Sequence, residues 1–408
     1  MIETNFKESE IGRIPHDWEV KTIEEIADDY AYGVGAEAIP YNGRDKYIRI
    51  TDIDEENGHY TPSPIVSPAF FSDNHIVKEN DLLIARTGAS VGKTYLYDQQ
   101  DGKLIYAGFL MKINIKHANA GYVFYKTKNS YYKKWVLQES ARTGQPGLNL
   151  EQVKTLQIPL PPTTAEQERI ADALSKIDSL ITDLDALIEK KRAIKTGTMQ
   201  QLLTGKKRLN GFTGEWKEVR LGDVAKMNSG GTPTSTNPAY YNGDIPFLSI
   251  SDMTSSGKYI QSTEKTITQL GLENSSARLF PAGTLMYAMY ASIGKCSITN
   301  IDTAISQAIL GFKLSDALDR DYLYYHFCFI ENIVKDMGQT GTQSNLSKKI
   351  VEDFELTIPP TIAEQSAIAA VLSGMDSEIA SLEQKRDKYI AIKQGMMQNL
   401  LTGKIRLV

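Results

Sequence analysis

Residues 161–209 read PPTTAEQERIADALSKIDSLITDLDALIEKKRAIKTGTMQQLLTGKKRL, and residues 359–407 read PPTIAEQSAIAAVLSGMDSEIASLEQKRDKYIAIKQGMMQNLLTGKIRL. The two stretches align without a gap, each residue of the first matching the residue 198 positions later. Glu166 matches Glu364, for example, and both stretches close on the run LLTGK. A match of this length indicates a tandem duplication, so the rest of the chain is expected to repeat as well.

Each stretch is predicted to form one long helix. A threonine follows two prolines and precedes a glutamate by three residues, as Thr163 precedes Glu166, and this is the pattern of a capping box. Gly205 and Gly403 then predict the C-terminal stop of the two helices. About forty residues of helix would extend roughly 60 Å at 1.5 Å per residue.

Apolar residues in both helices alternate spacings of four and three, which is the pattern of a coiled-coil seam. The seam residues are Ile170, Leu174, Ile177, Ile181, Leu184 and Ile188 in the first copy, and Ile368, Leu372, Met375, Ile379 and Leu382 in the second. Such a seam has to be buried, and two equivalent surfaces pair most simply about a two-fold axis. We therefore expect an antiparallel pair of helices. The alternative is that each helix packs only on its own domain.

The segments before these helices, 1–158 and 210–356, are distant copies of one another. Trp18 matches Trp216 at the same offset of 198, and ASVGK in the first segment corresponds to ASIGK in the second. Short apolar runs between Gly, Pro, Asn and Asp indicate mixed α/β domains with many turns. We predict a mixed α/β fold of two globular domains at opposite ends of two long antiparallel helices, with an internal pseudo-two-fold axis. The boundaries expected are 1–158, 159–209, 210–356 and 357–408.

The composition is that of a folded protein. Hydrophobic residues make up 41% of the chain. Its 408 residues exceed what one hydrophobic core usually supports, so two or more domains are expected. The N-terminus lacks the apolar core of a secretory signal, and no run of about eighteen apolar residues occurs. Two cysteines are too few for a disulfide scaffold or a structural zinc site. These features predict a cytoplasmic protein without a membrane partner.

The net charge is −5, but the basic residues are unevenly spread. Residues 1–102 hold nine Lys/Arg against twenty Asp/Glu, whereas residues 103–155 hold nine against two. The second segment also contains the aromatic residues Tyr106, Phe109, Tyr122, Tyr125, Tyr131, Tyr132 and Trp135. A basic segment interleaved with aromatic residues can hold a phosphate backbone. The alternative is a solvated helix face beside ordinary core aromatics.

No stretch of the chain has the pattern of a catalytic site. GASVGKT at 88–94 has three residues between its glycines, whereas a phosphate-binding loop needs four and a following helix. The Pro-Pro pairs before the long helices lack the neighbouring amide and aromatic residue of an amino-methyltransferase pocket, and the five histidines have no metal-ligand spacing. We therefore predict no catalytic residue, metal or cofactor in this chain.

The motifs PPxxAEQ, IAxxLSxxD and MQxLLTGK of the two long stretches resemble the conserved helices of type I restriction–modification specificity (S) subunits. SGGTPT at 229–234, followed by YYNGDIP at 240–246, resembles the opening of that family's target-recognition domains. The resemblance covers the whole chain: recognition domain, central helix, second recognition domain and C-terminal helix. The first domain departs from the pattern, because it has Tyr32-Gly33-Val34-Gly35 in place of SGGTPT, and its loop at 31–46 is expected to differ in shape.

The resemblance implies a non-catalytic, sequence-specific DNA-binding subunit in which each domain reads one half of a bipartite, asymmetric target in double-stranded DNA. It also implies that the helices act as spacer and docking platform for two methyltransferase (M) subunits, which bind S-adenosylmethionine and methylate adenine. A restriction (R) subunit can then be added, which makes the complex an endonuclease. Two alternatives are a specificity subunit whose partner fuses nuclease and methyltransferase, as in a type II-like system, and a coiled-coil scaffold that binds protein only.

Base edges and phosphates are bound by Arg, Lys, Asn, Gln, Ser and Thr side chains, and such residues recur in corresponding loops of both domains. In the first domain the predicted DNA-binding residues are Arg44, Lys46, Arg49, Arg86, Thr87, Ser90, Lys93, Arg142 and Gln145. In the second they are Ser229, Thr232, Thr234, Asn242, Tyr290, Lys295, Gln339, Thr342, Gln343 and Asn345. The alternative for each is a surface turn that binds nothing.

Overall fold

The computed structural model describes residues 5–141, 145–340 and 345–408, of which 337–340 are described by their backbone alone. The chain forms two compact units. The first unit contains Met1–Ala186 and Gln384–Val408, and the second contains Leu187–Glu383. Each unit therefore combines one globular domain with part of both long helices.

In the first unit, the globular domain is built on the antiparallel sheet β4-β11-β8-β9, beside the parallel pair β6-β10 and the antiparallel pair β5-β7. Its strands are β1 (Phe6–Lys7), β2 (Ile14–Pro15), β3 (Glu19–Thr22), β4 (Ala27–Tyr32), β5 (Ala38–Pro40), β6 (Lys46–Ile48), β7 (Val66–Pro68), β8 (Asp81–Ala85), β9 (Thr94–Leu96), β10 (Leu104–Tyr106), β11 (Leu110–Ile115) and β12 (Gln157–Leu160). Its helices are α1 (Ile23–Ile26), α2 (Ala120–Lys126), α3 (Ser130–Glu139) and α4 (Leu150–Lys154). We call this part the first domain.

In the second unit, the globular domain has a five-stranded sheet, β14-β22-β19-β20-β16, and a four-stranded sheet, β17-β15-β21-β18. Its strands are β13 (Lys217–Arg220), β14 (Ala225–Ser229), β15 (Tyr241–Leu248), β16 (Tyr259–Ile260), β17 (Lys265–Ile267), β18 (Arg278–Phe280), β19 (Leu285–Ala288), β20 (Cys296–Thr299), β21 (Thr303–Ile305), β22 (Ile309–Leu314) and β23 (Glu355–Ile358). Its helices are α6 (Leu221–Val224), α7 (Ile250–Ser255), α8 (Gln269–Glu273), α9 (Arg320–Thr340) and α10 (Lys348–Glu352). We call this part the second domain.

The duplication is visible in the order and register of the elements. In the first domain β3 pairs antiparallel with β12, and in the second β13 pairs antiparallel with β23. All four strands, and the short helices α1, α4, α6 and α10, begin at positions that differ by 198 between the two domains. The mixed α/β character and the internal repeat expected from the sequence are confirmed.

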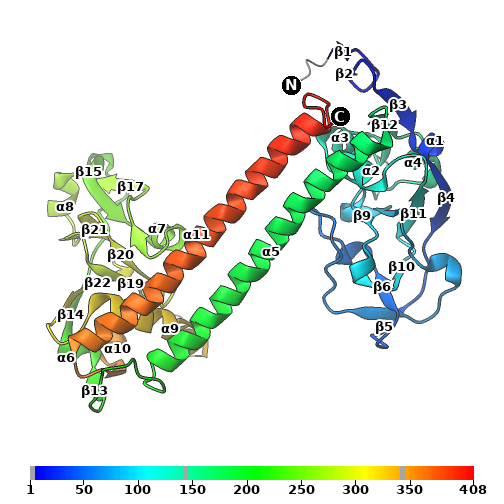
Figure 1. Ribbon diagram of the computed structural model, residues 1–408. Helices are drawn as coiled ribbons and strands as arrows, with labels where there is room; N and C mark the ends of the chain where they lie inside the picture. Colours follow the sequence, from blue (N-terminus) through cyan, green and yellow to red (C-terminus); the bar gives the residue numbers. More distant parts are fainter. Residues whose placement is uncertain (1–4, 142–144, 341–344) are drawn as a thin grey trace. The chain divides into compact units, whose positions relative to one another are not determined.

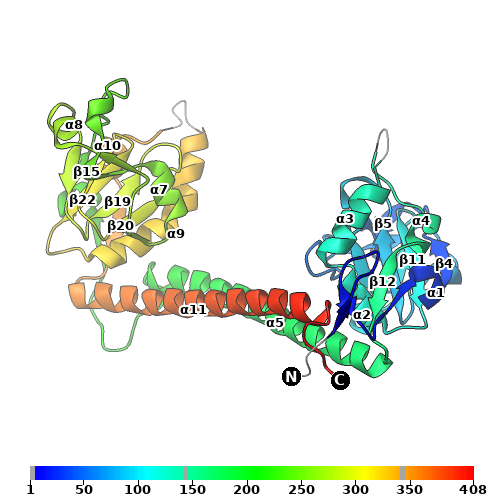
Figure 2. The same cartoon turned by 90° about the horizontal axis from the view of Figure 1, so that it is seen from above.

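The two long helices are α5 (Thr164–Leu202) and α11 (Ile362–Leu400), and each contains 39 residues. Gly205 and Gly403, with φ of +67° and +69°, lie just beyond their ends, where a residue with a side chain is strained. Figures 1 and 2 show α5 and α11 side by side and antiparallel within each unit. Neither helix, nor any other in the described part of the chain, has the continuous apolar stretch that crossing a bilayer requires.

The seam residues are buried, but against two different surfaces. Ile170 and Leu174 belong to one buried cluster with Trp18 and Tyr122 of the first domain, and with Leu400 at the end of α11. Ile368 and Leu372 take the same places in the core of the second domain. Of the remaining seam residues, Ile177, Leu184, Ile188 and Ile379 are buried, whereas Ile181, Met375 and Leu382 are half-buried. Each helix therefore packs on its own domain through its first turns, and its last turn packs in the core of the other domain, as Leu400 of α11 and Leu202 of α5 show.

The predicted capping boxes are only half formed. The hydroxyl of Thr163 accepts a hydrogen bond from the backbone N–H of Glu166 at 3.2 Å, and Thr361 does the same for Glu364 at 3.3 Å. The glutamate carboxylates, expected to accept from the N-cap backbone, are instead taken up by arginine side chains. The sequence prediction of a complete capping box is therefore corrected. The glutamate binds an arginine distant in the chain because the arginine offers its carboxylate two charged donors.

Candidate nucleic-acid interface

The main sheet of each domain has one end at the long helices and one end away from them. In the first domain β11 leads from Leu110 to Ile115, and the backbone N–H of Asn119 then donates to Gln167 of α5 at 2.9 Å. In the second domain the N–H of Asp319, after β22, donates to Gln365 of α11 at 2.8 Å. We call this end of each sheet the helix end and the opposite end the loop end.

The helix end carries a charged cluster. Arg406 donates to both carboxylate oxygens of Glu166 at 2.6 and 2.8 Å, and its guanidinium lies over the ring of Trp18 at 5.8 Å. Glu166 is 1% exposed, so its charge depends on this bidentate partner. The second unit repeats these contacts with the residues related by the offset of 198: Glu364, Arg208 and Trp216.

A second contact at the helix end joins each domain to both helices. The hydroxyl of Tyr125 donates to Asp178 of α5 at 2.8 Å, and Lys393 of α11 lies 2.5 Å from the other oxygen of that carboxylate. Burial raises the pKa of Tyr125, so its hydroxyl keeps the proton that it donates. The second unit repeats this arrangement with Tyr325, Asp376 and Lys195. The helix end therefore has the same chemistry in both halves of the chain.

At the loop end of the first domain, three segments distant in sequence meet. The N–H of Arg86 donates to the carbonyl of Phe109 at 3.0 Å, and the carbonyl of Arg86 accepts from the N–H of Leu148 at 2.9 Å. The N–H of Gly88 donates to the carbonyl of Pro146 at 3.0 Å. The loop after β8 is thereby held between the turn before β11 and the segment before α4.

The loop end of the second domain has the same backbone connections. The N–H of Met289 donates to the carbonyl of Ala308 at 2.8 Å, and the carbonyl of Met289 accepts from the N–H of Leu346 at 3.0 Å. Beside them the hydroxyl of Thr232 donates to the side-chain oxygen of Gln307 at 2.5 Å. The backbone is thus shared while the side chains differ, since Met289 stands where the first domain has Arg86.

A glycine begins the diverging loop in both domains. A side chain at Gly33 would lie 2.2 Å from the carbonyl oxygen of Ala107, and one at Gly230 would lie 1.8 Å from that of Ile305. Beyond these glycines the chains differ, because the first domain leads into β5, which pairs antiparallel with β7, and the second leads into β15, which pairs with β17 and β21. The expected difference in shape therefore begins after a backbone approach that both domains share.

Most of the predicted basic residues of the first domain already have partners within it. These pairs are Arg44 with Asp45, Lys46 with the carbonyl of Asp101, Arg49 with Asp52, and Lys93 with Glu55. The guanidinium of Arg86 instead lies over the ring of Tyr32, 4.4 Å from its centroid. Thr87 and Ser90 are half-buried in the same loop, and Gln145 is exposed beside it. Arg142 lies outside the described residues.

The predicted residues of the second domain come from three segments of the chain, and Ser229 and Asn242 lie in strands β14 and β15. Thr232, Thr234 and Asn242 are exposed, and the hydroxyl of Tyr241 joins their segments by donating to the carbonyl of Pro233 at 2.5 Å. Ser229, Tyr290 and Lys295 are half-buried, and Asn345 is exposed. Gln339 lies in the part of α9 described by its backbone alone, and Thr342 and Gln343 lie outside the described residues.

Tyr32 and Gln307 at the loop ends were missed as candidates by the sequence analysis, which named Phe109 among the aromatic residues of the basic segment. Tyr32 and Phe109 are 40% and 60% exposed, although both follow the aromatic pattern of core residues. Gln307 is an exposed amide between β21 and β22. A polar residue between two short buried strands is a signal that sequence reasoning can use, whereas an aromatic residue carries no sign of its exposure.

Much of the basic, aromatic segment at 103–155 is built into the first domain. Tyr106, Tyr122, Tyr125, Tyr132 and Trp135 are buried in the first domain, which confirms the alternative of ordinary core aromatics for these five. Several of its lysines are also occupied, since Lys112 pairs with Asp29 at 2.6 Å, Lys126 donates to the carbonyl of Leu401 at 3.0 Å, and Lys128 donates to that of Thr94 at 3.2 Å. Amphipathic aromatic and lysine side chains fill a core as readily as they line a groove.

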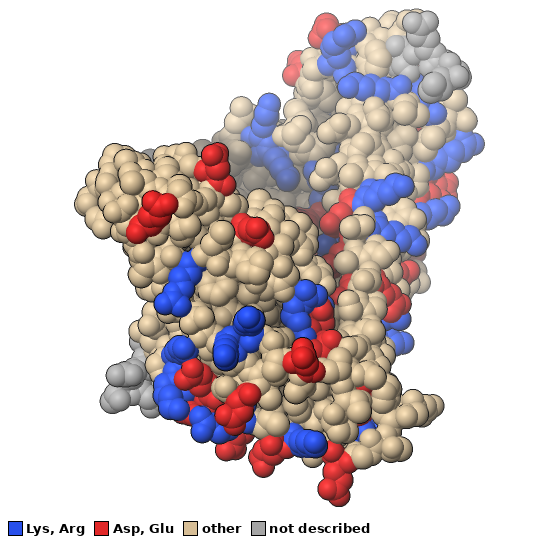
Figure 3. All heavy atoms as spheres, turned by 90° about the vertical axis from the view of Figure 1, so that its left-hand side faces the viewer, with Lys and Arg blue, Asp and Glu red and all other residues tan. Residues whose placement is uncertain are grey.

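The outer part of the second domain carries little charge. Residues 231–280 contain three Lys/Arg and four Asp/Glu. Figure 3 shows the side that carries β15, β17 and α8, where most surface atoms belong to neutral residues. Electrostatic attraction to phosphates is therefore weak here, and hydroxyl and amide groups provide most of the polar contacts that this surface offers.

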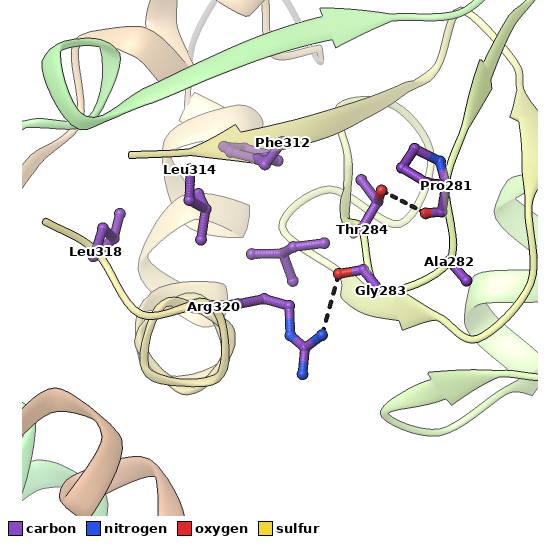
Figure 4. Close-up of a pocket in the computed structure, with 9 residues that line it drawn as sticks. Pro281, Ala282, Gly283, Thr284, Phe312, Leu314, Leu318 and Arg320 are labelled. Carbon is purple, nitrogen blue, oxygen red and sulfur yellow. Dashed lines mark hydrogen bonds between the residues drawn. The ribbon is translucent and has the colours of Figure 1, made fainter. Parts of the chain in front are cut away.

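A cavity of about 310 Å³ lies in the second domain but not at its loop end. It is lined by Leu285, Leu314 and their neighbours at the helix end of β22, and Arg320 donates to the carbonyl of Gly283 at its rim (Figure 4). The lining is mostly apolar and presents no group of converging polar side chains. The cavity is therefore not part of the candidate interface.

Comparisons with known proteins match the two halves of the chain separately. The family model described as the type I restriction modification DNA specificity domain matches residues 15–195 and again residues 213–390. The type I restriction enzyme MjaVIII specificity subunit of Methanocaldococcus jannaschii is 26% identical over 446 residues, covering 99% of this chain and 97% of its own length. The EcoR124I/EcoR124II specificity subunit of Escherichia coli is 25% identical over 261 residues, covering 59% of this chain and 60% of its own length.

The fold is also similar to a solved structure. The crystal structure of the type I restriction–modification S subunit from M. genitalium superposes with a TM-score of 0.64. It covers 94% of this chain and 96% of the solved chain, at 16% sequence identity. At this identity the likeness establishes the arrangement of the elements.

Proposed function

The chain belongs to the type I restriction–modification DNA specificity family, and on this premise we propose that it is the DNA-reading subunit of a restriction–modification complex. Each domain reads one half of a bipartite target in double-stranded DNA. The two halves differ in sequence because the loop ends differ in their side chains. The protein acts in the cytoplasm, where the chromosome is accessible to it.

The observation that carries the proposal is the contrast between the two ends of the domains. The helix end repeats its buried ion pair in both units at distances that agree within 0.1 Å, as Arg406 with Glu166 and Arg208 with Glu364 show. The loop end keeps the backbone connections but exchanges the side chains. Two domains that read different DNA sequences from one pair of helices need the same attachment to those helices and different side chains at their loop ends.

The long helices supply the platform. Each would extend about 58 Å at 1.5 Å per residue, which exceeds the roughly 34 Å of one turn of DNA. On α5, Leu180, Leu187 and Ile194 remain exposed by 46%, 37% and 45% at a spacing of seven residues, which places them on one face. We assign this apolar stripe to docking of a helix from a methyltransferase subunit.

The chemistry then belongs to the partners. Two methyltransferase subunits bind S-adenosylmethionine and methylate adenine, and restriction subunits add cleavage. In this chain the sequence 88–94 forms the short turn Gly88–Ser90 and leads into strand β9, whereas a phosphate-binding loop leads into a helix. This supports a subunit that contributes recognition and assembly without a catalytic residue.

The test is methylome sequencing of cells that carry the cognate methyltransferase, with and without the gene for this chain. The proposal expects adenine methylation at a split, asymmetric motif only when both genes are present. Unchanged methylation, with both proteins expressed and associated, would contradict it and favour a scaffold that binds protein alone. Purified complex that cleaves DNA without a separate restriction subunit would identify the fused, type II-like partner instead.

A further inference from the structure

We propose that Arg86 reads a guanine in the half-target of the first domain, and that Tyr32 holds its guanidinium in place for this contact. The inference rests on the proposed function. It deepens that function by naming one specificity-determining residue and the base that it recognises.

The environment of Arg86 differs from that of the other arginines in the described part of the first domain. Arg13, Arg44 and Arg49 each lie within 4 Å of a carboxylate, from Glu8, Asp45 and Asp52 respectively. Within the described residues, the side chain of Arg86 has no carboxylate partner, and its Nε is buried without a hydrogen bond. An unpaired cation with a buried donor lowers the stability of the domain, and such costs are characteristic of functional positions.

The guanidinium is nevertheless fixed in position. Its carbon lies 4.4 Å from the centroid of the Tyr32 ring, and the hydroxyl of Tyr32 accepts a hydrogen bond from the N–H of Leu150 at 3.3 Å. The backbone of Arg86 is held on both sides, by Phe109 and by Leu148. Stacking leaves the edge of the planar group available, and a fixed fork loses little conformational entropy when it binds.

The chemistry of this fork matches guanine. Two parallel N–H donors of arginine are complementary to N7 and O6 of guanine in the major groove, and this pair is the commonest specific contact of arginine with DNA. The Tyr32 ring that stacks on the guanidinium is 40% exposed, and Phe109, whose carbonyl accepts from the backbone N–H of Arg86, is 60% exposed. Both side chains offer apolar contact to neighbouring bases.

A phosphate contact is disfavoured by the comparison within the chain. Phosphates have the same shape in both halves of any target, so a residue that binds one is expected in both domains. At the matching backbone position the second domain has Met289, which is 3% exposed. The backbone connections at this position match in the two domains while the side chain differs, and this is expected of a residue that reads sequence.

The test uses the complete complex with its methyltransferase and compares the methylated motifs of variants. Arg86→Gln removes the charge and the fork, Arg86→Lys keeps the charge without the fork, and Arg86→Met introduces the residue that the second domain carries there. Arg13→Gln is the matched control, because it removes an exposed arginine paired with Glu8. Melting temperature and association with the methyltransferase are measured for every variant.

The expected result is a motif with guanine at one position of one half, which becomes degenerate there in Arg86→Gln and in Arg86→Met. The preference for guanine should fall by about 5- to 150-fold, the range for losing one bidentate contact, and Arg86→Lys should keep part of it. The other half of the motif should be unchanged in all variants. Arg13→Gln should have the wild-type motif.

Three results would overturn the inference: a variant motif identical to that of the wild type, a uniform loss of methylation without a change in base preference, or no guanine in the affected half. The second result would assign Arg86 to a phosphate. Failure of the proposed function is distinguishable from these, because the wild-type chain itself would then direct no methylation.

Discussion

At the scale of single residues, buried polar side chains show where this fold is sensitive to its surroundings. His326 lies in α9 and is 7% exposed, and its Nδ1 is buried without a hydrogen bond among the described contacts. Burial lowers the pKa of His326 from 6.5 to about 4, since the charged imidazole has lost its water. The folded protein therefore holds this side chain neutral at pH values where the unfolded chain protonates it.

The predicted consequence is a loss of stability in acid. Between about pH 6.5 and pH 4 the unfolded chain binds a proton at His326 that the folded chain does not, so the free energy of unfolding falls as the pH drops. This one group changes the free energy of unfolding by at most about 1.4 kcal/mol per pH unit. We expect His326→Leu to remove this pH-dependent part of the free energy of unfolding. The measurement is urea denaturation of both proteins between about pH 6.5 and pH 4, together with pulsed hydrogen exchange at strand β19 of the same domain. Equal slopes in the two proteins would show that His326 is not the titrating group.

At the scale of elements, the attachment of the helices to the domains depends on ion pairs between segments distant in sequence. Arg406 and Glu166 are separated by 240 residues in the chain, and Arg208 and Glu364 by 156. In both pairs the carboxylate is almost fully buried and the arginine spans it with two donors. Each pair closes its unit, because it holds the segment that follows one long helix against the start of the other.

We predict that Arg406→Leu lowers the free energy of unfolding of the first unit by about 3–5 kcal/mol, because Glu166 is then buried without a cation. Adding Glu166→Leu should restore much of the loss, since both charges are then absent. A double-mutant cycle by denaturation measures this coupling. The control is Arg13→Leu in the same unit, whose side chain is 70% exposed and should cost less than about 1 kcal/mol. Losses of similar size for both variants would refute a buried, coupled pair.

At the scale of the whole molecule, the repeated helix end indicates that each domain can be exchanged without disturbing the other. The contacts described for the first domain with the helices lie within its own unit, and they involve Asp17, Asn119 and Tyr125 among other residues. A replacement domain from another member of the family would thus need to keep Trp18, Asn119 and Tyr125. Its loop end can be of any sequence that folds.

The prediction is that such an exchange changes one half of the methylated motif and leaves the other half and the spacing between them intact. The two loop ends contribute their side chains independently, so their effects on the target should add. Methylome sequencing of cells with the exchanged chain and the native methyltransferase measures both halves at once. A change in both halves would contradict the assignment of one reader to each half.

Much of the architecture follows from the sequence alone. The duplication, the two long helices and their glycine stops depend on local periodicity and on residues such as Gly205 and Gly403, whose backbone preference is a property of the residue itself. The threonine caps and the seam at Ile170 and Leu174 can be predicted from the local sequence for the same reason. These features require no knowledge of what lies next to them in space.

The tertiary structure decided which charges and aromatic rings are free. Lys112 is paired with Asp29, 83 residues away, and the tyrosines near it fill a core, while Tyr32 and Phe109 are exposed beside Arg86. Glu166, expected to cap its own helix, binds Arg406 instead. Whether a polar group is available to DNA depends on the neighbours that folding brings to it, and a single sequence does not contain those neighbours, because ion pairs and burial form between segments distant in the chain.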